Sequence, residues 1–547
     1  MAPDLVAWFP VGFTPRPEQI ALLDALGAAI AAAEEDPKAP SVFLVEAPPG
    51  VGKSHVAMAL ARWSGSAYLL TSQKLLQDQY EREFGRDVQL VKGRENYLCE
   101  RYPGARVTTA YGMCRRRRGP PCVCPYTRAK LAALDGPIFC TNTSYFLTLR
   151  QWRRDDLERR RLLVVDEAHT LEAQLASVFT VAFAPEQMRA WFGAMLPHLD
   201  VADDYRALLD EHGARLRSEL ALVDEALDAL APPDGEDDFL ALPPSPRELD
   251  LFARRDTLEN AVARVGFFLD APETEWIVRY PDPSAGTLEL VPLSVAPWAF
   301  DLLFDAADIT VLSSAFLGHH GTLAECFGLE PGLVRTLRAP SPFALEHRPI
   351  VYRPVGVLSR DSLAELEPAL FSEVATIMAA HPRDKGLIHA PSYAAAERLV
   401  RALAERAPAE HRRLLPVESA TAKTRALELH RASPLPTVLV SPSLREGVDL
   451  PDEQLRFQIV TKMPYPDLGD PWTAARQARD HRWYALETAK ALVQAYGRSC
   501  RHADDHGVTY VLDGQFARFL TRYRPLLPPW FLDAAHAALL DAKRRGV

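Results

Sequence analysis

The segment Ala47 to Ser54 reads APPGVGKS and combines the residue types that hold a chain of phosphates. Gly50 and Gly52 let backbone N–H groups approach the phosphate oxygens, Lys53 supplies a positive charge, and Ser54 offers a hydroxyl to Mg²⁺. A strand-like run precedes the loop and a helix-like run follows it, so the N-terminus of that helix points at the phosphates. The segment therefore predicts a site for a nucleoside triphosphate and Mg²⁺, although Ala47 replaces the first glycine of the strict motif.

A second acidic segment, DEAH (Asp166 to His169), directly follows the apolar run 162–165. Parallel strands end at one edge of a sheet, and a carboxylate at that edge lies where ligands bind. We expect Asp166 to hold Mg²⁺, Glu167 to orient or deprotonate an attacking water, and His169 to connect this site to the facing domain.

Nearer the C-terminus, QAYGRSCR places Gln494, Arg498 and Arg501 at the spacing of one helix face. Guanidinium groups stabilise charge on a transferred γ-phosphate, so we expect both arginines to reach a nucleotide bound across a cleft. Taken alone, the same pattern also fits a surface helix with two solvated arginines. Upstream, LREGVDLP forms a second polar loop after a strand, and Asp449 within it is a further candidate for nucleotide binding.

Four of the seven cysteines, Cys99, Cys114, Cys122 and Cys124, fall within 26 residues of a 547-residue chain. So few cysteines in so long a chain do not resemble a secreted disulfide framework, whereas such a cluster in a reducing compartment favours a metal site. Cys326 and Cys500 have no cysteine neighbours in the sequence and are expected to be ordinary buried residues.

The charge balance is acidic overall but basic around the cysteines. The chain has a formal net charge of −10, whereas residues 85–130 hold eleven Lys or Arg, including Arg115 to Arg118, against three Asp or Glu. A basic face on an acidic protein suits nucleic acid in one groove, although solvated surface arginines would give the same counts. Neither a basic, apolar leader nor a membrane-length apolar run is present, so we expect a cytoplasmic protein that does not enter membranes.

The order of strand-like and helix-like segments predicts two α/β halves. Buried strands are expected at 41–45, 67–70, 162–165 and 309–312, and a second series of strands and helices begins near residue 347. Between the halves, long helical patterns such as 205–229 and a hairpin with its turn at 281–286 predict an inserted, mainly helical region.

These motifs, in this order, resemble the XPD/DinG family of superfamily-two DNA helicases. The matching segments are RPEQ, APPGVGKS, TSQKLLQDQ, GRENYLC, VVDEAH, LSSAFLG, LIHAPSY, REGVDLP and QAYGRSCR. The resemblance implies two RecA-like motor domains, with a cluster domain and a helical arch inserted in the first. It also implies that Arg16 and Gln19 of RPEQ read the adenine of ATP. The implied boundaries are first motor domain 1–95, 135–175 and 291–345, cluster domain 96–134, arch 176–290 and second motor domain 346–547.

The family carries a 4Fe-4S cluster on four cysteines, since thiolates are its usual ligands. The last ligand in relatives precedes Pro-Tyr, as Cys124 does here, and Cys140 before Thr-Asn matches a strand residue instead. The resemblance therefore selects Cys99, Cys114, Cys122 and Cys124. The Cys122-Val-Cys124 spacing is tighter than is usual, which leaves open a Zn²⁺ site, a vestigial site, or Cys140 replacing one of the pair.

The resemblance further implies a monomeric, ATP-dependent 5′-to-3′ helicase that translocates on single-stranded DNA and acts on forked or 5′-tailed duplexes, or on DNA/RNA hybrids. An ATPase that remodels or recruits without processive unwinding is the alternative. A nuclease is not expected, because the first motif begins at Phe13 and leaves no room for an exonuclease domain. Motif III departs from the family, with Phe316 where relatives commonly have Thr, so weaker coupling of hydrolysis to strand separation is expected.

Overall fold

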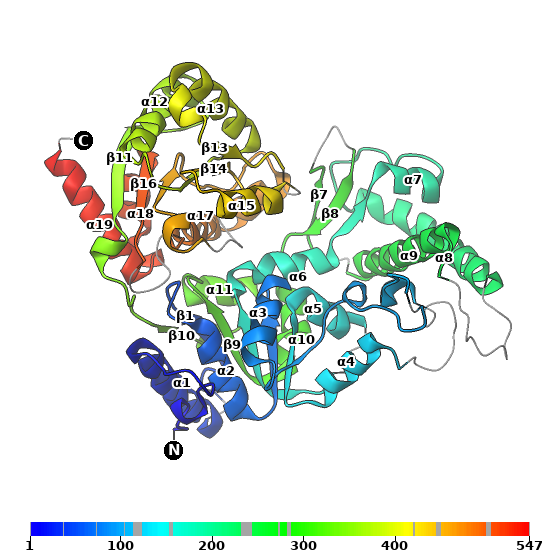
Figure 1. The fold of residues 1–547 in the computed structure, drawn as a ribbon. Coiled ribbons are helices and arrows are strands. Elements are labelled where there is room, and N and C mark those ends of the chain that lie inside the picture. The colour runs from blue at the N-terminus through cyan, green and yellow to red at the C-terminus, as the bar shows by residue number, and fades with distance from the viewer. Residues whose placement is uncertain are drawn as a thin grey trace.

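The computed structural model contains two parallel β-sheets, each covered by helices, and a third region that projects from the first sheet (Figure 1). The structure describes residues 2–36, 38–72, 74–102, 104–112, 123–152, 157–230, 243–271, 274–281, 286–419, 422–444, 450–498 and 505–545. The predicted α/β architecture with parallel sheets is confirmed.

The first sheet has seven strands in the order β10-β1-β9-β5-β2-β4-β3, and all neighbouring pairs are parallel. The strands are β1 Val42–Glu46, β2 Ala67–Thr71, β3 Gln89–Leu90, β4 Ile138–Asn142, β5 Arg160–Asp166, β9 Ala307–Ser314 and β10 Val334–Arg338. Every residue of β1 and β2 is buried, because helices cover both faces of the sheet. This is why these strands read as continuous apolar runs.

In the described part of the chain, eight helices cover the two faces of this sheet. They are α1 Pro17–Glu35, α2 Lys53–Ser64, α3 Lys74–Phe84, α4 Pro125–Asp135, α5 Thr143–Trp152, α6 Leu171–Phe179, α10 Ala296–Leu302 and α11 His320–Cys326. One buried cluster joins α1 and α2 to one face of the sheet, and a second cluster fills the other face and continues into the projecting region.

The second sheet has six strands in the order β11-β16-β15-β12-β14-β13, again all parallel. The strands are β11 Ile350–Gly356, β12 Gly386–His389, β13 Leu414–Pro416, β14 Val438–Ser441, β15 Phe457–Val460 and β16 Val508–Asp513. Its helices are α12 Leu363–Ala380, α13 Tyr393–Arg406, α14 Pro408–His411, α15 Lys423–Ala432, α16 Pro471–Arg479, α17 His481–Tyr496, α18 Gln515–Tyr523 and α19 Pro529–Arg544.

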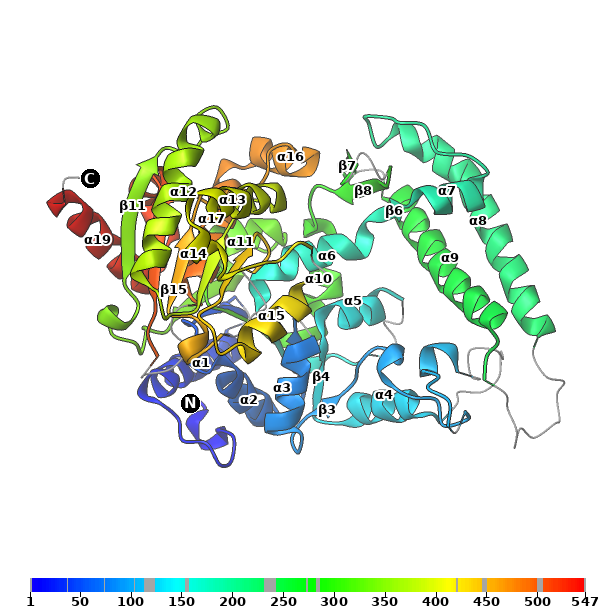
Figure 2. The ribbon, with the colours of Figure 1, turned by 45° about the horizontal axis from the view of Figure 1, so that its top comes forward.

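The projecting region combines a small antiparallel sheet with two long helices that lie side by side (Figure 2). The sheet has the order β6-β8-β7, and the helices include one over 204–229, where a long helix was expected. Its elements are β6 Val181–Phe183, α7 Pro185–Phe192, α8 Asp204–Ala229, α9 Pro246–Asp270, β7 Trp276–Arg279 and β8 Leu288–Pro292. The predicted hairpin is confirmed as β7 and β8, which pair antiparallel.

Candidate nucleotide site between the two halves

The phosphate loop joins β1 to α2, as its sequence predicted. Gly50 and Gly52 have φ angles of +80° and +85°, in the left-handed region that favours glycine. A Cβ at Gly52 would also lie 2.5 Å from Nε2 of Gln19. Lys53 and Ser54 form the first two positions of α2, and Lys53 Nζ lies 3.4 Å from the carbonyl oxygen of Ala47. The loop thus presents the N-terminus of α2, with its ammonium group, to a bound anion.

Arg16 and Gln19 hold this loop through its backbone. Arg16 Nη1 donates to the carbonyl oxygen of Gly50 at 2.7 Å, and Gln19 Nε2 donates to that of Gly52 at 3.2 Å. The Gln19 side chain also accepts from the Arg16 N–H at 2.8 Å. Both residues therefore lie at the loop, while their predicted role in reading adenine remains a prediction.

Asp166 is the last residue of β5 and is 5% exposed. The Tyr80 hydroxyl donates to its Oδ2 at 3.1 Å. Burial, together with the neighbouring Glu167 carboxylate, raises the pKa of Asp166 to about 6, against the opposing effect of Lys53. A divalent cation would favour the ionised form, and a buried carboxylate is an oxygen donor of the kind that Mg²⁺ binds.

Glu167 has a φ of +53°, which is rare for a residue with a side chain. Burial would raise the pKa of its carboxyl, but the charges of Lys53, His169 and Arg498 lower it below its usual range. Glu167 is therefore held ionised beside Lys53, as an acceptor that can orient a water molecule.

His169 connects three segments through one ring nitrogen. Its Nδ1 lies 2.9 Å from Ser314 Oγ, 3.2 Å from Glu167 Oε2 and 3.3 Å from Nε2 of Gln494. Ser314 Oγ also lies 3.4 Å from Glu167 Oε2. Since Gln494 belongs to α17 in the second half, the DEAH segment contacts both the end of β9 and the opposite half of the molecule.

The end of α17 lies against the phosphate loop. A Cβ at Gly497 would lie 2.7 Å from Cγ of Pro49, so only glycine allows this approach. The helix ends at Tyr496, and the prediction that Arg498 continues the helical face of Gln494 is wrong. Arg498 is nonetheless close enough for its charge to lower the pKa of Glu167. Arg501 and Asp449 lie outside the described residues.

Several residues at this site were not found from the sequence. Tyr80 lies in a polar helix with no signal that it would reach Asp166. Glu46 carried a signal, because it is an acidic residue in an otherwise apolar strand directly before the phosphate loop. Glu172 and Arg476, which pair across the two halves at 2.5 Å, had none, since they are 304 positions apart.

Two of the four predicted metal ligands are described. Cys99 and Cys124 are both buried, and a Cβ at Gly112, two positions before Cys114, would lie 3.1 Å from the Cys99 Sγ. The chain therefore passes close to Cys99 as it approaches Cys114. Among the described residues no three His, Cys, Asp or Glu side chains form a metal-binding group, and Cys114, Cys122 and Arg115 to Arg118 lie outside them.

Cys124 precedes α4, where thiolates are favoured. Burial would raise the pKa of its thiol, but hydrogen bonds with Thr127 and the adjacent backbone lower it. This chemistry fits a thiolate ligand of either an iron–sulfur cluster or Zn²⁺. Cys140 differs, because it is a fully buried residue of β4 and burial raises its pKa to about 12. The expectation that Cys140 is a strand residue is confirmed.

The tyrosines near the cysteines are largely packed. Tyr102 and Tyr126 are buried, and the Tyr126 hydroxyl lies 2.7 Å from that of Tyr145. The rings of Tyr97 and Tyr126 meet edge to face at 5.9 Å, and that of Tyr111 lies 6.4 Å from Phe252 on α9. Packing therefore accounts for their positions.

A groove of about 1340 Å³ crosses the second half where β11, β12, β15 and β16 end. Tyr465 and Tyr484 line it with their rings stacked 5.8 Å apart at 12°. Its cationic side chains are Arg360, Lys462, Arg518 and Arg522. Its acidic side chains are Asp467 and Glu487.

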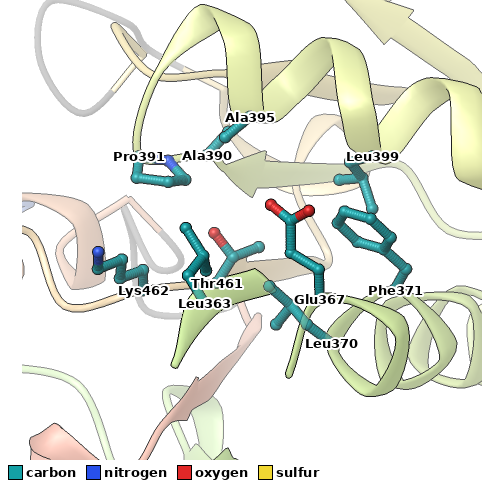
Figure 3. A pocket seen from close by; sticks show the side chains of 10 residues that line it. All are labelled: Leu363, Glu367, Leu370, Phe371, Ala390, Pro391, Ala395, Leu399, Thr461 and Lys462. Carbon is teal, nitrogen blue, oxygen red and sulfur yellow. The ribbon is translucent and has the colours of Figure 1, made fainter. Parts of the chain in front are cut away.

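A smaller pocket adjoins this groove, since Pro391 and Lys462 line both. Figure 3 shows the carboxylate of Glu367 pointing into it between apolar side chains. Glu367 also accepts a hydrogen bond from Nη2 of Arg398 at 2.7 Å. Of the two openings, the groove has the larger volume, and it is the one lined by several cationic side chains and by stacked aromatic rings.

Among the described helices, none has the length and apolar composition needed to cross a bilayer.

Comparison with known proteins finds a matching family model and relatives of this chain. The family model for a helicase C-terminal domain matches residues 374–533. The ATP-dependent helicase DinG of Mycobacterium tuberculosis (strain H37Rv) is 30% identical over 286 residues, which cover 48% of this chain and 41% of the relative. Regulator of telomere elongation helicase 1 of Bos taurus is 33% identical over 101 residues, 16% of this chain and 8% of the relative. The chain thus spans less than half the length of the curated relatives it matches.

Solved structures show the same fold over nearly the whole chain. Xpd4 of S. tokodaii matches with a TM-score of 0.56 and 16% identity, covering 93% of this chain and 98% of the other. A structure called XPD helicase matches with a TM-score of 0.61 and 14% identity, covering 94% and 98%. These solved structures share the fold of this chain, the helicase C-terminal domain model matches part of its second half, and its sequence is similar to that of DinG over 286 residues.

Proposed function

We propose that the protein is an ATP-dependent DNA helicase that translocates 5′ to 3′ on single-stranded DNA. The observation that supports this proposal most directly is that the QAYGR segment of the second half contacts the phosphate loop and the DEAH segment of the first half. Gly497 packs on Pro49, and Gln494 lies 3.3 Å from His169. A site built from both halves changes when they move, so nucleotide turnover can drive their opening and closing.

In this proposal the chain's own residues divide the work at the nucleotide. Lys53 and the N-terminus of α2 bind the phosphates, and Ser54 and Asp166 would hold Mg²⁺, which supplies charge stabilisation at the phosphates when bound. Glu167 orients or deprotonates the attacking water. Arg498 and Arg501 stabilise the charge that develops on the γ-phosphate.

Further residues bind the base and report the nucleotide state. Arg16 and Gln19 contact adenine from their position against the loop, and Asp449 contributes from the second half. His169 and Gln494 pass the state of the nucleotide between the halves. The contacts of Ser314, Glu167 and Gln494 with one ring nitrogen of His169 support this role, because a shift of any partner changes the contacts of the others.

We propose that single-stranded DNA enters the groove of the second half. Arg360, Lys462, Arg518 and Arg522 would contact phosphates, and Tyr465 would stack on a base. Binding of this kind weakens as salt rises, since the cations displace condensed counterions. The stacked pair of Tyr465 and Tyr484 supports the assignment, because a preformed aromatic face needs no reordering when a base docks.

The remaining parts of the proposal concern the inserted segments. Residues 96–134 would form a cluster domain in which Cys99, Cys114, Cys122 and Cys124 hold a 4Fe-4S cluster, with Zn²⁺ as the alternative. Residues 176–290 would form an arch, and 1–95, 135–175 and 291–345 the first motor domain, with 346–547 as the second. The basic stretch Arg115 to Arg118 would bind DNA near the fork.

Strand displacement with the purified protein tests this function. Duplexes with a 5′ tail, a 3′ tail, a fork or blunt ends, and a DNA/RNA hybrid with a 5′ tail, are compared, with ATP hydrolysis measured on the same samples. Unwinding of the 5′-tailed or forked duplex, and of a DNA/RNA hybrid with a 5′ tail, supports the proposal. Hydrolysis stimulated by single-stranded DNA without strand displacement would instead favour an ATPase that remodels or recruits.

A further inference from the structure

We propose that Phe316 is a positioning residue that holds the second half against the nucleotide site before any nucleotide binds. The inference rests on the proposed function, and it concerns a position where the sequence departs from the family. Phe316 is 1% exposed, yet it does not pack in the core of the half to which its strand belongs. It lies in the buried cluster of the second half, together with Leu486 and Val493 of α17.

Consecutive side chains therefore enter opposite cores. Leu317 is fully buried in the cluster of the first sheet, whereas Phe316 belongs to the cluster built on β11, β15, β16, α17, α18 and α19. Among the described residues that are buried in that cluster, Phe316 is the one that precedes Ile350, while Leu345 packs against the cluster partly buried. The ring thus forms an apolar joint between the two halves.

The backbone beneath this joint is fixed to the phosphate loop. Oε1 of Glu46 accepts from the N–H groups of Leu317 and Gly318 at 2.9 and 2.8 Å, and Oε2 accepts from Arg338 Nε at 2.6 Å. Glu46 is 2% exposed and directly precedes Ala47, whose N–H donates to the Ser314 carbonyl at 3.0 Å. The loop and the joint are therefore anchored to the same strand end.

The backbone two residues after Phe316 also lies close to α17. Gly318 has a φ of +92°, and a Cβ there would overlap the Leu486 side chain. A threonine at position 316 would bury a hydroxyl in the apolar cluster, which is unfavourable without a hydrogen-bond partner. Phenylalanine instead favours the closed arrangement of α17 over the site. Figures 1 and 2 both show α17 beside α11, the helix that follows this segment, and Arg482 pairs with Glu325 there at 2.9 Å.

Because of this apolar contact, the two halves are expected to stay closed over the nucleotide site even when no nucleotide is bound. When only a fraction of molecules is competent, the apparent affinity for ATP falls by that fraction. If Phe316→Thr lowers the closed population to about a tenth, the KM for ATP rises about tenfold in the absence of DNA. Single-stranded DNA would restore closure, so its stimulation of hydrolysis would be larger in the variant than in the wild type.

Hydrogen exchange on the nucleotide-free, full-length protein tests the joint without needing enzymatic activity. In Phe316→Thr, we expect exchange at 307–326 and at 481–496 to be at least about tenfold faster than in the wild type, which corresponds to one decade in the opening equilibrium. Phe531→Leu is the matched control, since Phe531 is fully buried in the same cluster but belongs to α19. It should destabilise the second half while leaving 307–326 protected.

Gly318→Ala provides a second variant that keeps the phenyl ring and should loosen the same contact through Leu486. Unchanged protection of 307–326 in both Phe316→Thr and Gly318→Ala would overturn the proposal, as would a KM for ATP equal to that of the wild type in both. A wild-type protein that hydrolyses no ATP would refute the proposed function, and the exchange data would still decide the joint.

Discussion

Glu172 and Arg476 form a buried ion pair between the two halves. Their Oε1 and Nη2 atoms lie 2.5 Å apart, and the side chains are 12% and 6% exposed. The other carboxylate oxygen accepts from Trp483 Nε1 at 3.1 Å. Glu172 lies three residues after His169, so the helix that follows the DEAH segment is held to α16 and α17. Burial raises the pKa of Glu172 despite the opposing effect of Arg476.

Removing one partner of this pair should be strongly destabilising. Glu172→Ala leaves the Arg476 guanidinium buried without its carboxylate, which typically costs about 3–5 kcal/mol. Replacing both residues by methionine should cost much less than the sum of the single changes, because no charge is then buried. Urea unfolding of Glu172→Met, Arg476→Met and the double variant measures this coupling.

An exposed pair at the same interface is the control. Arg482 and Glu325 join α17 to α11 at 2.9 Å, with side chains 63% and 55% exposed. Glu325→Ala should change the free energy of unfolding by less than about 1 kcal/mol. Equal effects of Glu172→Ala and Glu325→Ala would contradict the assignment of the buried pair as a main contact between the halves.

The buried imidazole of His430 should make the free energy of unfolding depend on pH. The ring is fully buried, with Nε2 2.8 Å from the Gln454 carbonyl oxygen and Nδ1 2.9 Å from Thr437 Oγ1. Burial lowers its pKa below 6.5 in the folded protein. The unfolded chain therefore takes up the proton first, and the free energy of unfolding falls as the pH drops below about 6.5. The slope from this group is at most about 1.4 kcal/mol per pH unit.

Urea unfolding at pH 7.5, 6.5 and 5.5 compares the wild type with His430→Gln, whose stability should change less over this range. His411→Gln, at a partly exposed position in α14, should keep the wild-type slope. If His430→Gln retains the full pH dependence, the buried imidazole is not the titrating group.

Much of the fold followed from local patterns, but contacts between distant segments did not. The strands 42–46 and 160–166 were predictable because burial on both faces leaves continuous apolar runs. The loop at Gly50 and Gly52 was predictable because few residues adopt its backbone. In contrast, β10 and β11 were missed, and nothing local marks the pairing of Glu172 with Arg476, since 304 positions separate them.

At motif III, the sequence marked Phe316 as a departure from the family pattern. The weaker coupling expected from that departure stays a prediction. The structure places the ring in the second half's core, where it adds a contact between the halves. A substitution can be recognised from a motif, but whether it removes or creates a contact depends on which core receives the side chain.

Lys53→Ala should reduce ATP hydrolysis by at least about 100-fold, because the loop loses the charge that stabilises the phosphates. Binding of single-stranded DNA should remain, since the groove lies in the second half. Phosphate release and fluorescence anisotropy with a labelled oligonucleotide measure the two properties. Lys38→Ala, in an exposed turn after α1, is the control and should match the wild type in both assays. Unwinding by the Lys53→Ala variant would show that the loop does not bind the ATP that drives unwinding.

The cysteine segment makes the metal content measurable. We expect anaerobically purified wild type to contain iron and sulfide and to absorb visible light, and Cys114→Ser to lose both, because thiolates hold the cluster. Cys140→Ala should retain the metal, since Cys140 is fully buried in β4. Hydrolysis stimulated by DNA should largely survive in Cys114→Ser, because Cys114 is not among the residues assigned to nucleotide binding, while strand displacement should stop. A colourless wild type with stoichiometric zinc would exclude an iron–sulfur cluster. Loss of metal in Cys140→Ala would show that Cys140 is a ligand in place of Cys122 or Cys124.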